Sequence, residues 1–257
     1  MTTGYDASAR LYVEHDLGDG RSVGLTAAQA HYLKHVLRLS VGARVALFNG
    51  RDGEWMSRID TIGRGWGSLE VEKHLRDQTD EPDLWLLFAP IKRARLDFLV
   101  QKAVELGVSR ISPIYTERTE VRRLNLERHR ANVIEAAEQC ERLSLPEFTE
   151  PCALAAALEN FPSDRQLLVC AERGEAMPLD ALLHEPQPRG ASHAFLCGPE
   201  GGFSQTELDG LAKLSFIRFV SLGPRILRAE TAALSAVACW QAALGDWRRR
   251  PPEGDHV

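Results

Sequence analysis

Two glycine-bearing segments near the C-terminus constrain the fold more than any other feature of the chain. Residues 198–204 (GPEGGFS) follow the short apolar run 194–197, and residues 222–231 (LGPRILRAET) follow the run 216–222. Each segment opens onto a helical pattern, so strand, loop and helix occur in this order twice. Such units predict a parallel sheet whose strand ends share one rim, where open α/β sheets bind their ligands. Glycine at this rim lets the backbone approach a flat ligand closely.

The middle of the chain continues the same alternation. Apolar runs predict strands at 84–90, 108–115 and 167–170, and helical patterns cover 96–106, before Gly107, and 126–143. Alternation of this kind predicts an α/β domain with a largely parallel sheet. The polar stretch 75–82, which ends in proline, reads as a linker. We therefore expect one domain over residues 1–75 and a second over 83–250.

The first domain has a different pattern. Short strand-like runs occur at 11–14, 45–48, 55–59 and 69–71, with a strong hairpin signal at 49–53. Between them, Thr26 precedes an amphipathic helix as an N-cap. A small β-barrel with one helix fits this pattern.

Cysteine and histidine usage argues against a metal or disulfide framework. The five cysteines are scattered and never spaced C-x-x-C, which favours reduced thiols in a cytosol. His31 and His35 have the i, i+4 spacing of a two-histidine metal site, but no third ligand is evident nearby. We expect no metal, and a packing or polar-face role for this pair. No apolar run approaches the roughly 20 residues of a membrane span, and no secretory signal is evident.

The charge distribution bears on nucleic-acid binding. The net charge of −5 gives no sign of a polyanionic partner. Residues 91–130, however, carry ten Lys and Arg against five Asp and Glu. This segment could form a basic stripe for RNA or simply a solvated face.

The two glycine segments match neither the P-loop nor the G-x-G-x-x-G fingerprint. GPEGGFSxxE followed by LGPRILRAETA instead resembles the SPOUT superfamily of knotted RNA methyltransferases, and within it the RsmE family, which methylates N3 of a uridine in 16S ribosomal RNA. Residues 92–107 resemble the opening of that family's methyltransferase domain, and 138–142 resemble its EQCGR-like motif, with Glu141 where a small residue is usual. Residues 10–73 are similar to its N-terminal PUA-like domain.

This resemblance implies a knotted α/β methyltransferase domain with a C-terminal trefoil knot, joined to a PUA-like barrel. It also implies S-adenosylmethionine (SAM) as cofactor, 16S rRNA or the small ribosomal subunit as substrate, a cytoplasmic location and a homodimer. The apolar face of the last helix, over 232–244, either contributes to the dimer or packs within its own subunit. Two alternatives remain open: another RNA base or a ribose 2′-hydroxyl as target, or a non-catalytic RNA-binding and assembly module.

Site residues follow from the matched motifs. Deprotonation of uracil N3 places negative charge on its oxygens, which arginine stabilises. We assign this role to Arg228, with Glu230 as its partner and Arg142 nearby; the alternative for Arg228 and Glu230 is a structural ion pair. The expected cofactor-binding residues are Glu172, Leu196, Gly198, Glu200, Gly201, Gly202, Leu222, Gly223, Ile226, Leu227 and Thr231. The expected RNA-binding residues are Arg10, Lys34, Arg38, Lys92, Arg93, Arg95 and Arg118.

Overall fold

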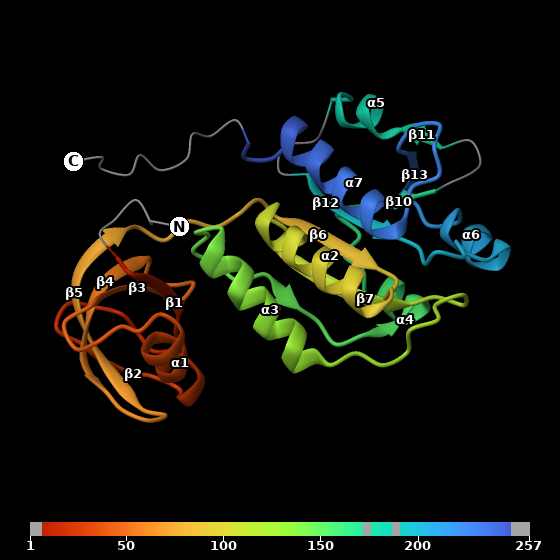
Figure 1. Cartoon of the computed structure of the whole chain (residues 1–257). Coiled ribbons are helices and arrows are strands. Elements are labelled where there is room, and N and C mark those ends of the chain that lie inside the picture. Colours follow the sequence, from red (N-terminus) through yellow and green to blue (C-terminus); the bar gives the residue numbers. More distant parts are fainter. Residues whose placement is uncertain (1–6, 172–175, 187–190, 248–257) are drawn as a thin grey trace. The chain divides into compact units, whose positions relative to one another are not determined.

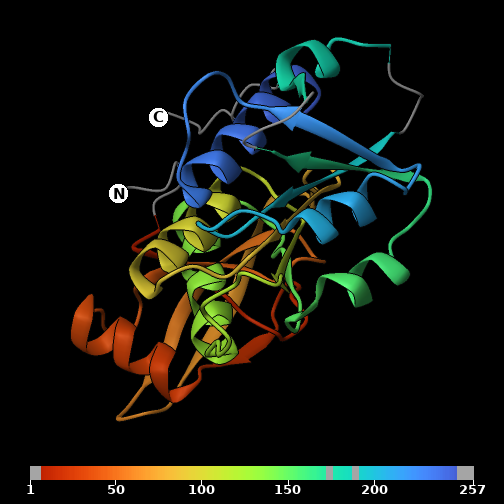
Figure 2. The same ribbon diagram turned by 90° about the vertical axis from the view of Figure 1, so that its right-hand side faces the viewer.

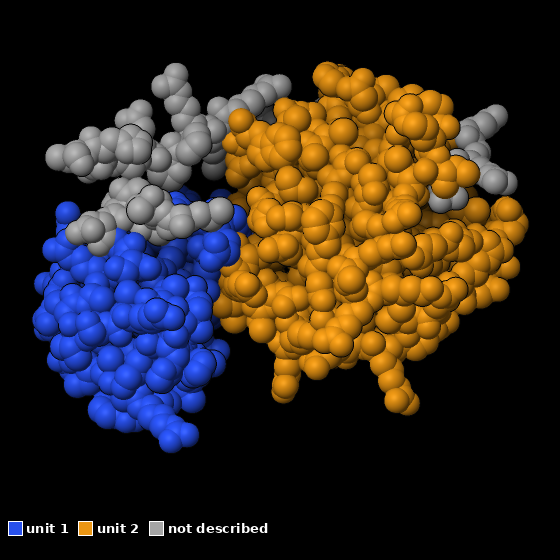
Figure 3. Space-filling view, viewed as in Figure 1, with its two compact units in different colours: residues 1–80, 137–144, 250–257 blue, residues 81–136, 145–249 orange. Residues whose placement is uncertain are grey.

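The computed structural model describes residues 7–171, 176–186 and 191–247. The chain divides into two compact units (Figure 3). Unit 1 comprises residues 1–80, 137–144 and 250–257, and unit 2 comprises residues 81–136 and 145–249. From the sequence we expected one domain over residues 1–75 and a second over 83–250. The structure differs in one segment, because residues 137–144 belong to unit 1.

Unit 1 contains a five-stranded, curved sheet (Figure 1) in the order β1-β3-β4-β5-β2. Its strands are β1 (Ala9–Tyr12), β2 (Ser22–Gly24), β3 (Arg44–Phe48), β4 (Glu54–Ile62) and β5 (Gly67–Arg76). β1 runs parallel to β3, and the other pairs are antiparallel. Leu47, Ile59 and Leu69 are fully buried in its core. The strand periodicity of the sequence therefore located this sheet, apart from the short β2.

One helix packs into this sheet. α1 (Ala27–His31) begins at Thr26, whose hydroxyl accepts a hydrogen bond from the Gln29 amide, while the Gln29 side chain accepts one from the Thr26 amide. This reciprocal capping box satisfies two donors at the helix start. The helix continues as a π-helical turn, η1 (Tyr32–Val36), which the sequence did not predict. Leu33 of this turn is buried in the unit's core.

A buried ion pair holds segment 137–144 within unit 1. Arg10 Nε lies 2.5 Å from Glu54 Oε1, and Arg10 donates further hydrogen bonds to the carbonyl oxygens of Ala137 and Arg142 at 2.8 and 2.7 Å. Arg76 Nε donates to the second oxygen of Glu54 at 2.7 Å. Arg10 and Glu54 are 6% and 1% exposed. Burial lowers the pKa of Arg10, and the charge of Glu54 opposes this shift. A buried ion pair is tolerated when its remaining donors are satisfied, as they are here.

Unit 2 is built on an eight-stranded sheet in which every recorded strand pairing is parallel. The main order is β11-β13-β10-β12-β6-β7-β8, and β9 pairs with β7. The strands are β6 (Leu84–Phe88), β7 (Arg110–Tyr115), β8 (Glu147–Phe148), β9 (Cys152–Ala153), β10 (Arg165–Cys170), β11 (Met177–Pro178), β12 (Ser192–Cys197) and β13 (Ile217–Ser221). The parallel α/β domain expected from the sequence is confirmed. The trefoil knot stays a prediction.

Helices cover this sheet on both faces (Figures 1 and 2). They are α2 (Arg93–Glu105), α3 (Leu126–Gln139), α4 (Leu154–Glu159), α5 (Leu179–Leu183), α6 (Gln205–Leu211) and α7 (Ala229–Ala243). α2 and α7 pack side by side, and Gln241 of α7 donates to the carbonyl oxygen of Leu106 at 2.7 Å. Val237 and Trp240 of α7 are buried within the chain itself. These two residues therefore pack inside their own subunit.

Candidate active site

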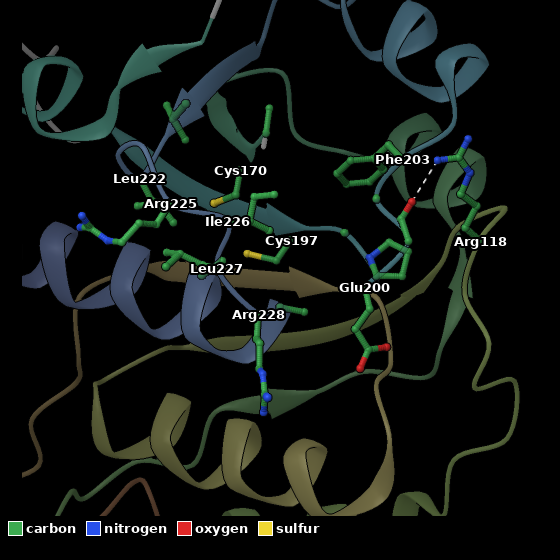
Figure 4. Close-up of a pocket in the computed structure, with 18 of the residues that line it drawn as sticks. Arg118, Cys170, Cys197, Glu200, Phe203, Leu222, Arg225, Ile226, Leu227 and Arg228 are labelled. Carbon is green, nitrogen blue, oxygen red and sulfur yellow. Dashed lines mark hydrogen bonds between the residues drawn. The ribbon is translucent and has the colours of Figure 1, made fainter. Parts of the chain in front are cut away.

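A cavity of about 580 Å³ opens at the carboxyl ends of β10, β12 and β13 (Figure 4). It lies in unit 2, and both glycine-bearing loops line it. The two loops lie on either side of the central strand β10, because β10 pairs with both β12 and β13. The rim of the sheet that the strand, loop and helix pattern predicted as a ligand site therefore contains a cavity.

The first loop, residues 198–204, is held by its own backbone and by its neighbours. Gly202, with φ of 67°, donates its amide to the Pro199 carbonyl oxygen at 2.8 Å, which closes a turn that favours glycine. A Cβ on Gly198 would lie 2.9 Å from the Phe203 ring. Arg118 Nη1 donates to the Gly201 carbonyl oxygen at 2.9 Å. The loop therefore presents backbone to the cavity in a fixed shape.

The end of this loop is fixed by a second capping box. The Ser204 hydroxyl accepts from the Glu207 amide at the start of α6, and the Glu207 carboxylate accepts from the Ser204 amide at 2.8 Å. The other oxygen of Glu207 accepts from the Glu117 amide at 2.8 Å. One carboxylate thus ties the loop to the segment that follows β7.

The second loop, residues 222–228, contributes apolar surface and positive charge. Gly223 has φ of 96°, a left-handed conformation that favours glycine. Leu222, Ile226 and Leu227 line the cavity, and Ile226 is 71% exposed. Arg228 is the N-cap residue of α7 and also lines the cavity. Exposed apolar side chains gathered in a hollow are typical of a ligand-binding surface.

Arg95 of α2 connects the first loop with the start of α7. Its Nη1 lies 3.1 Å from Glu200 Oε1 in the first loop, and its Nε lies 3.6 Å from Glu230 Oε1 in the first turn of α7, just after the second loop. Glu230 is 8% exposed, and its Oε2 has no hydrogen-bond partner among the described residues. The expected pairing of Glu230 with Arg228 is therefore wrong for this structure. Arg95, which we expect to bind RNA phosphates, pairs here with both carboxylates; its side chain is 39% exposed, and the RNA contact stays a prediction.

Most of the expected cofactor-binding residues lie in the cavity wall. Those that line it are Gly198, Glu200, Gly201, Gly202, Leu222, Gly223, Ile226 and Leu227. Among the described residues, Leu196 and Thr231 are not part of the lining: Leu196 is fully buried in the core of the sheet, and Thr231 is exposed on α7. Glu172 lies outside the described residues.

Sequence reasoning missed several lining residues, including Cys170, Ala171, Cys197 and Phe203. Cys170 and Cys197 are the last residues of β10 and β12. Ligands bind at the carboxyl ends of parallel strands, so this rule could have identified both cysteines as lining residues. The Phe203 ring lies against Gly198, and the sequence pattern does not predict this contact.

The remaining expected residues fall in different environments. Arg142 belongs to unit 1, is buried, and donates from Nη2 to the Ser144 hydroxyl at 3.1 Å; it is not in the described lining of the cavity. Arg10 is enclosed in its ion pair with Glu54, which gives it a structural role instead of the expected RNA contact. Lys34 is half-buried, and its Nζ lies 3.4 Å from the Ile62 carbonyl oxygen.

Arg38, Lys92 and Arg93 are exposed and stay predicted RNA contacts. The His31 and His35 rings lie 5.0 Å apart, and no cluster of three or more metal-ligating side chains occurs in the described part of the chain. Within that part, no helix is both long and apolar enough to cross a bilayer.

Known proteins match this chain over nearly its whole length. The RNA methyltransferase domain family matches residues 79–241, and the RNA methyltransferase PUA domain family matches residues 25–65. Ribosomal RNA small subunit methyltransferase E of Rickettsia conorii is 34% identical over 230 residues, which span 89% of this chain and 93% of the relative. The chain belongs to the ribosomal RNA small subunit methyltransferase E family. It is an RNA methyltransferase of the SPOUT type with a PUA domain.

Two further members of the ribosomal RNA small subunit methyltransferase E family support this assignment. The Synechocystis member is 34% identical over 227 residues, covering 87% of this chain and 74% of its own. The crystal structure of the Neisseria gonorrhoeae member, bound to S-adenosyl methionine, superimposes with a TM-score of 0.84 at 30% identity, covering 93% of this chain and 99% of that one.

Proposed function

We propose that this protein transfers a methyl group from SAM to N3 of a uridine in small-subunit ribosomal RNA. The observation that carries the proposal is the cavity at the strand ends of unit 2, whose wall is formed by both glycine-bearing loops. Membership of the ribosomal RNA small subunit methyltransferase E family supports the substrate class, and the SAM-bound Neisseria gonorrhoeae structure supports the cofactor.

The cavity suits SAM in size and chemistry. Its volume of about 580 Å³ falls within the range of small-molecule sites, which is roughly 300 to 1,000 Å³. Leu222, Ile226 and Leu227 offer apolar surface to a flat adenine ring. Residues 198–202 also line the cavity, and three of these five residues are glycines. SAM, when bound, supplies a methyl group that its sulfonium already makes electrophilic.

The protein's own residues must then position the uracil and stabilise its charge. Neutral uracil is a poor nucleophile at N3, and loss of the N3 proton spreads negative charge onto O2 and O4. Arg228 lines the cavity from the start of α7. We assign it to electrostatic stabilisation of that charge. A guanidinium group does not release its proton readily enough to act as the base that removes the N3 proton.

Glu230 pairs with Arg95 and not with Arg228, so we give it no direct part in stabilising the uracil charge. Arg95 pairs with Glu200 of the first loop and with Glu230 in the first turn of α7, so it links that loop to the helix that follows the second loop. We therefore propose a positioning role for Glu230, with Arg95 as its partner. Arg142 stays a predicted contributor to the catalytic site.

We further propose that the PUA domain binds rRNA through Lys34 and Arg38, that the protein acts as a homodimer, and that it works in the cytoplasm, where ribosomal subunits assemble. Lys92 and Arg93 are exposed at the start of α2 and supply positive charge in unit 2. Phosphate contacts by such residues position RNA without reading its sequence.

Nucleoside mass spectrometry of small-subunit rRNA tests the reaction. Deletion of the gene should remove one 3-methyluridine, and the wild-type gene should restore it, whereas a gene carrying Arg228→Ala should restore it poorly. Loss of a ribose-methylated or C5-methylated nucleoside in its place would reject the assigned position. An unchanged set of modified nucleosides would favour the non-catalytic assembly module.

A further inference from the structure

Two cysteines face each other on neighbouring strands beside the cavity. Cys170 ends β10 and Cys197 ends β12, and the parallel ladder pairs the two residues directly. Side chains of directly paired residues project from the same face of a sheet. Both cysteines line the cavity, and Figure 4 shows them next to each other in its wall. The described cysteines are all free thiols.

Directly paired residues on neighbouring strands have the spacing that a disulfide needs. Neighbouring strands lie about 4.8 Å apart, and the Cα atoms of disulfide-bonded cysteines are separated by about 4.4 to 6.8 Å. A hydrogen bond with the Cys170 thiol, together with burial, raises the pKa of Cys197 well above its ordinary value. Cys197 is therefore a poor first nucleophile, and we assign the first reaction with an oxidant to Cys170.

We propose that Cys170 and Cys197 form a reversible disulfide that regulates cofactor binding in this cavity. Cys170 is half-buried and Cys197 is 2% exposed, so a peroxide that enters the cavity meets Cys170 first. This regulation rests on the function proposed above, whereas formation of the disulfide is independent of that function.

The oxidant is hydrogen peroxide, and the reaction has two steps. Cys170 Sγ attacks one peroxide oxygen, the O–O bond breaks, and the departing hydroxide takes the thiol proton to leave as water, which gives a sulfenic acid. Cys197 Sγ then attacks the sulfenic sulfur, the S–O bond breaks, and the hydroxide leaves with the Cys197 proton as a second water. Two thiols are oxidised to one disulfide while one peroxide is reduced to two waters.

The disulfide changes the cavity because it cross-links two residues of its wall. The bond fixes the separation of their Cβ atoms at about 3.8 Å and the torsion about the S–S bond near 90°, so the two strand ends can no longer move independently. Cys197 directly precedes Gly198 of the first loop, and Cys170 directly precedes Ala171, another lining residue. Oxidation therefore restricts the start of the loop that should hold SAM and removes two free thiols from the cavity wall. By linkage, bound SAM disfavours the disulfide to the same extent.

The test uses the full-length, reduced protein. It is treated with hydrogen peroxide, its remaining thiols are alkylated, and peptides are mapped by mass spectrometry. We expect a linked Cys170–Cys197 peptide that dithiothreitol removes and that forms more slowly with SAM present. Calorimetry should show SAM binding weakened by about tenfold or more after oxidation, and recovered after reduction.

Single variants provide the controls. Cys170→Ser and Cys197→Ser should each bind SAM equally before and after peroxide, whatever their starting affinity, while Cys239→Ser, at an exposed position on α7, should keep the linked peptide. If one variant fails to fold by circular dichroism, the other decides. Absence of the linked peptide, or a linked protein with unchanged affinity, overturns the proposal. Failure of the reduced protein to bind SAM rejects the proposed function instead, and peptide mapping still decides whether the bond forms.

Discussion

Gly201 is the position where cofactor contact can be separated from folding. It is absent from the residues with positive φ, and a Cβ placed there would meet Arg118 Cβ and Cδ at 3.6 and 3.7 Å, which is ordinary contact. Gly201→Val should therefore leave the loop intact, whereas Gly198 and Gly202 cannot be substituted without a clash or backbone strain. The valine side chain would occupy space that the ligand needs.

The expected loss can be estimated from contact area. If valine holds the ligand away from about 55 Å² of apolar surface, the cost at roughly 25 cal/mol per Å² is about 1.4 kcal/mol. This is a tenfold weaker affinity for SAM, which isothermal titration calorimetry measures directly.

The matched control is Gly210→Ala on α6, where a Cβ meets nothing within 4 Å; its affinity should be unchanged. The reasoning is refuted if Gly201→Val unfolds at the same urea concentration as wild type and binds SAM with unchanged affinity.

Four further predictions concern catalysis, RNA binding, pH dependence and assembly. Arg228→Ala should lower turnover by about a hundredfold with little change in SAM affinity; a loss confined to SAM affinity would make Arg228 a cofactor ligand. The double variant Lys34→Ala/Arg38→Ala should reduce the slope of log RNA affinity against log salt by about 1.4 to 1.8 in filter binding, and an intact slope would remove both residues from the RNA surface. Burial, assisted by the charge of Arg165, lowers the pKa of His193; the unfolded state therefore takes up the proton first, so stability is complete above about pH 6.5 and declines as the pH falls toward the folded pKa. His193→Phe should flatten this decline in urea unfolding at pH 7.5 and 5.5, and a decline as steep as wild type would exclude His193 as its source. Light scattering should give about twice the chain mass of 28.6 kDa, and a monomer mass would reject the dimer.

The sequence predicted the cavity because its determinants are local. Each glycine-bearing loop directly follows an apolar strand and directly precedes a helix, so short-range patterns were enough to place both loops at one rim. The same holds for the helix cap at Thr26, whose partner Gln29 lies three residues away.

Residues whose partners are distant in sequence could not be predicted in the same way. Arg95 pairs with Glu200 and Glu230, and Arg10 pairs with Glu54, over separations that no local pattern encodes. An arginine that binds RNA and an arginine buried in an ion pair look alike in sequence, and only the fold distinguishes them. This is why two of the expected RNA contacts proved to have structural partners.

The ion pair of Arg10 and Glu54 also limits how this protein can be divided and recombined. Two of the acceptors that satisfy Arg10 are carbonyl oxygens of Ala137 and Arg142, encoded more than a hundred codons downstream. A gene fragment ending at residue 80 would leave a buried guanidinium short of acceptors, at a cost of about 1 to 3 kcal/mol for each unsatisfied donor. Residues 1–80 therefore cannot be transferred alone to another protein without loss of stability. Recombination that exchanged only these residues would separate the Arg10 charge from two carbonyl oxygens that accept its hydrogen bonds.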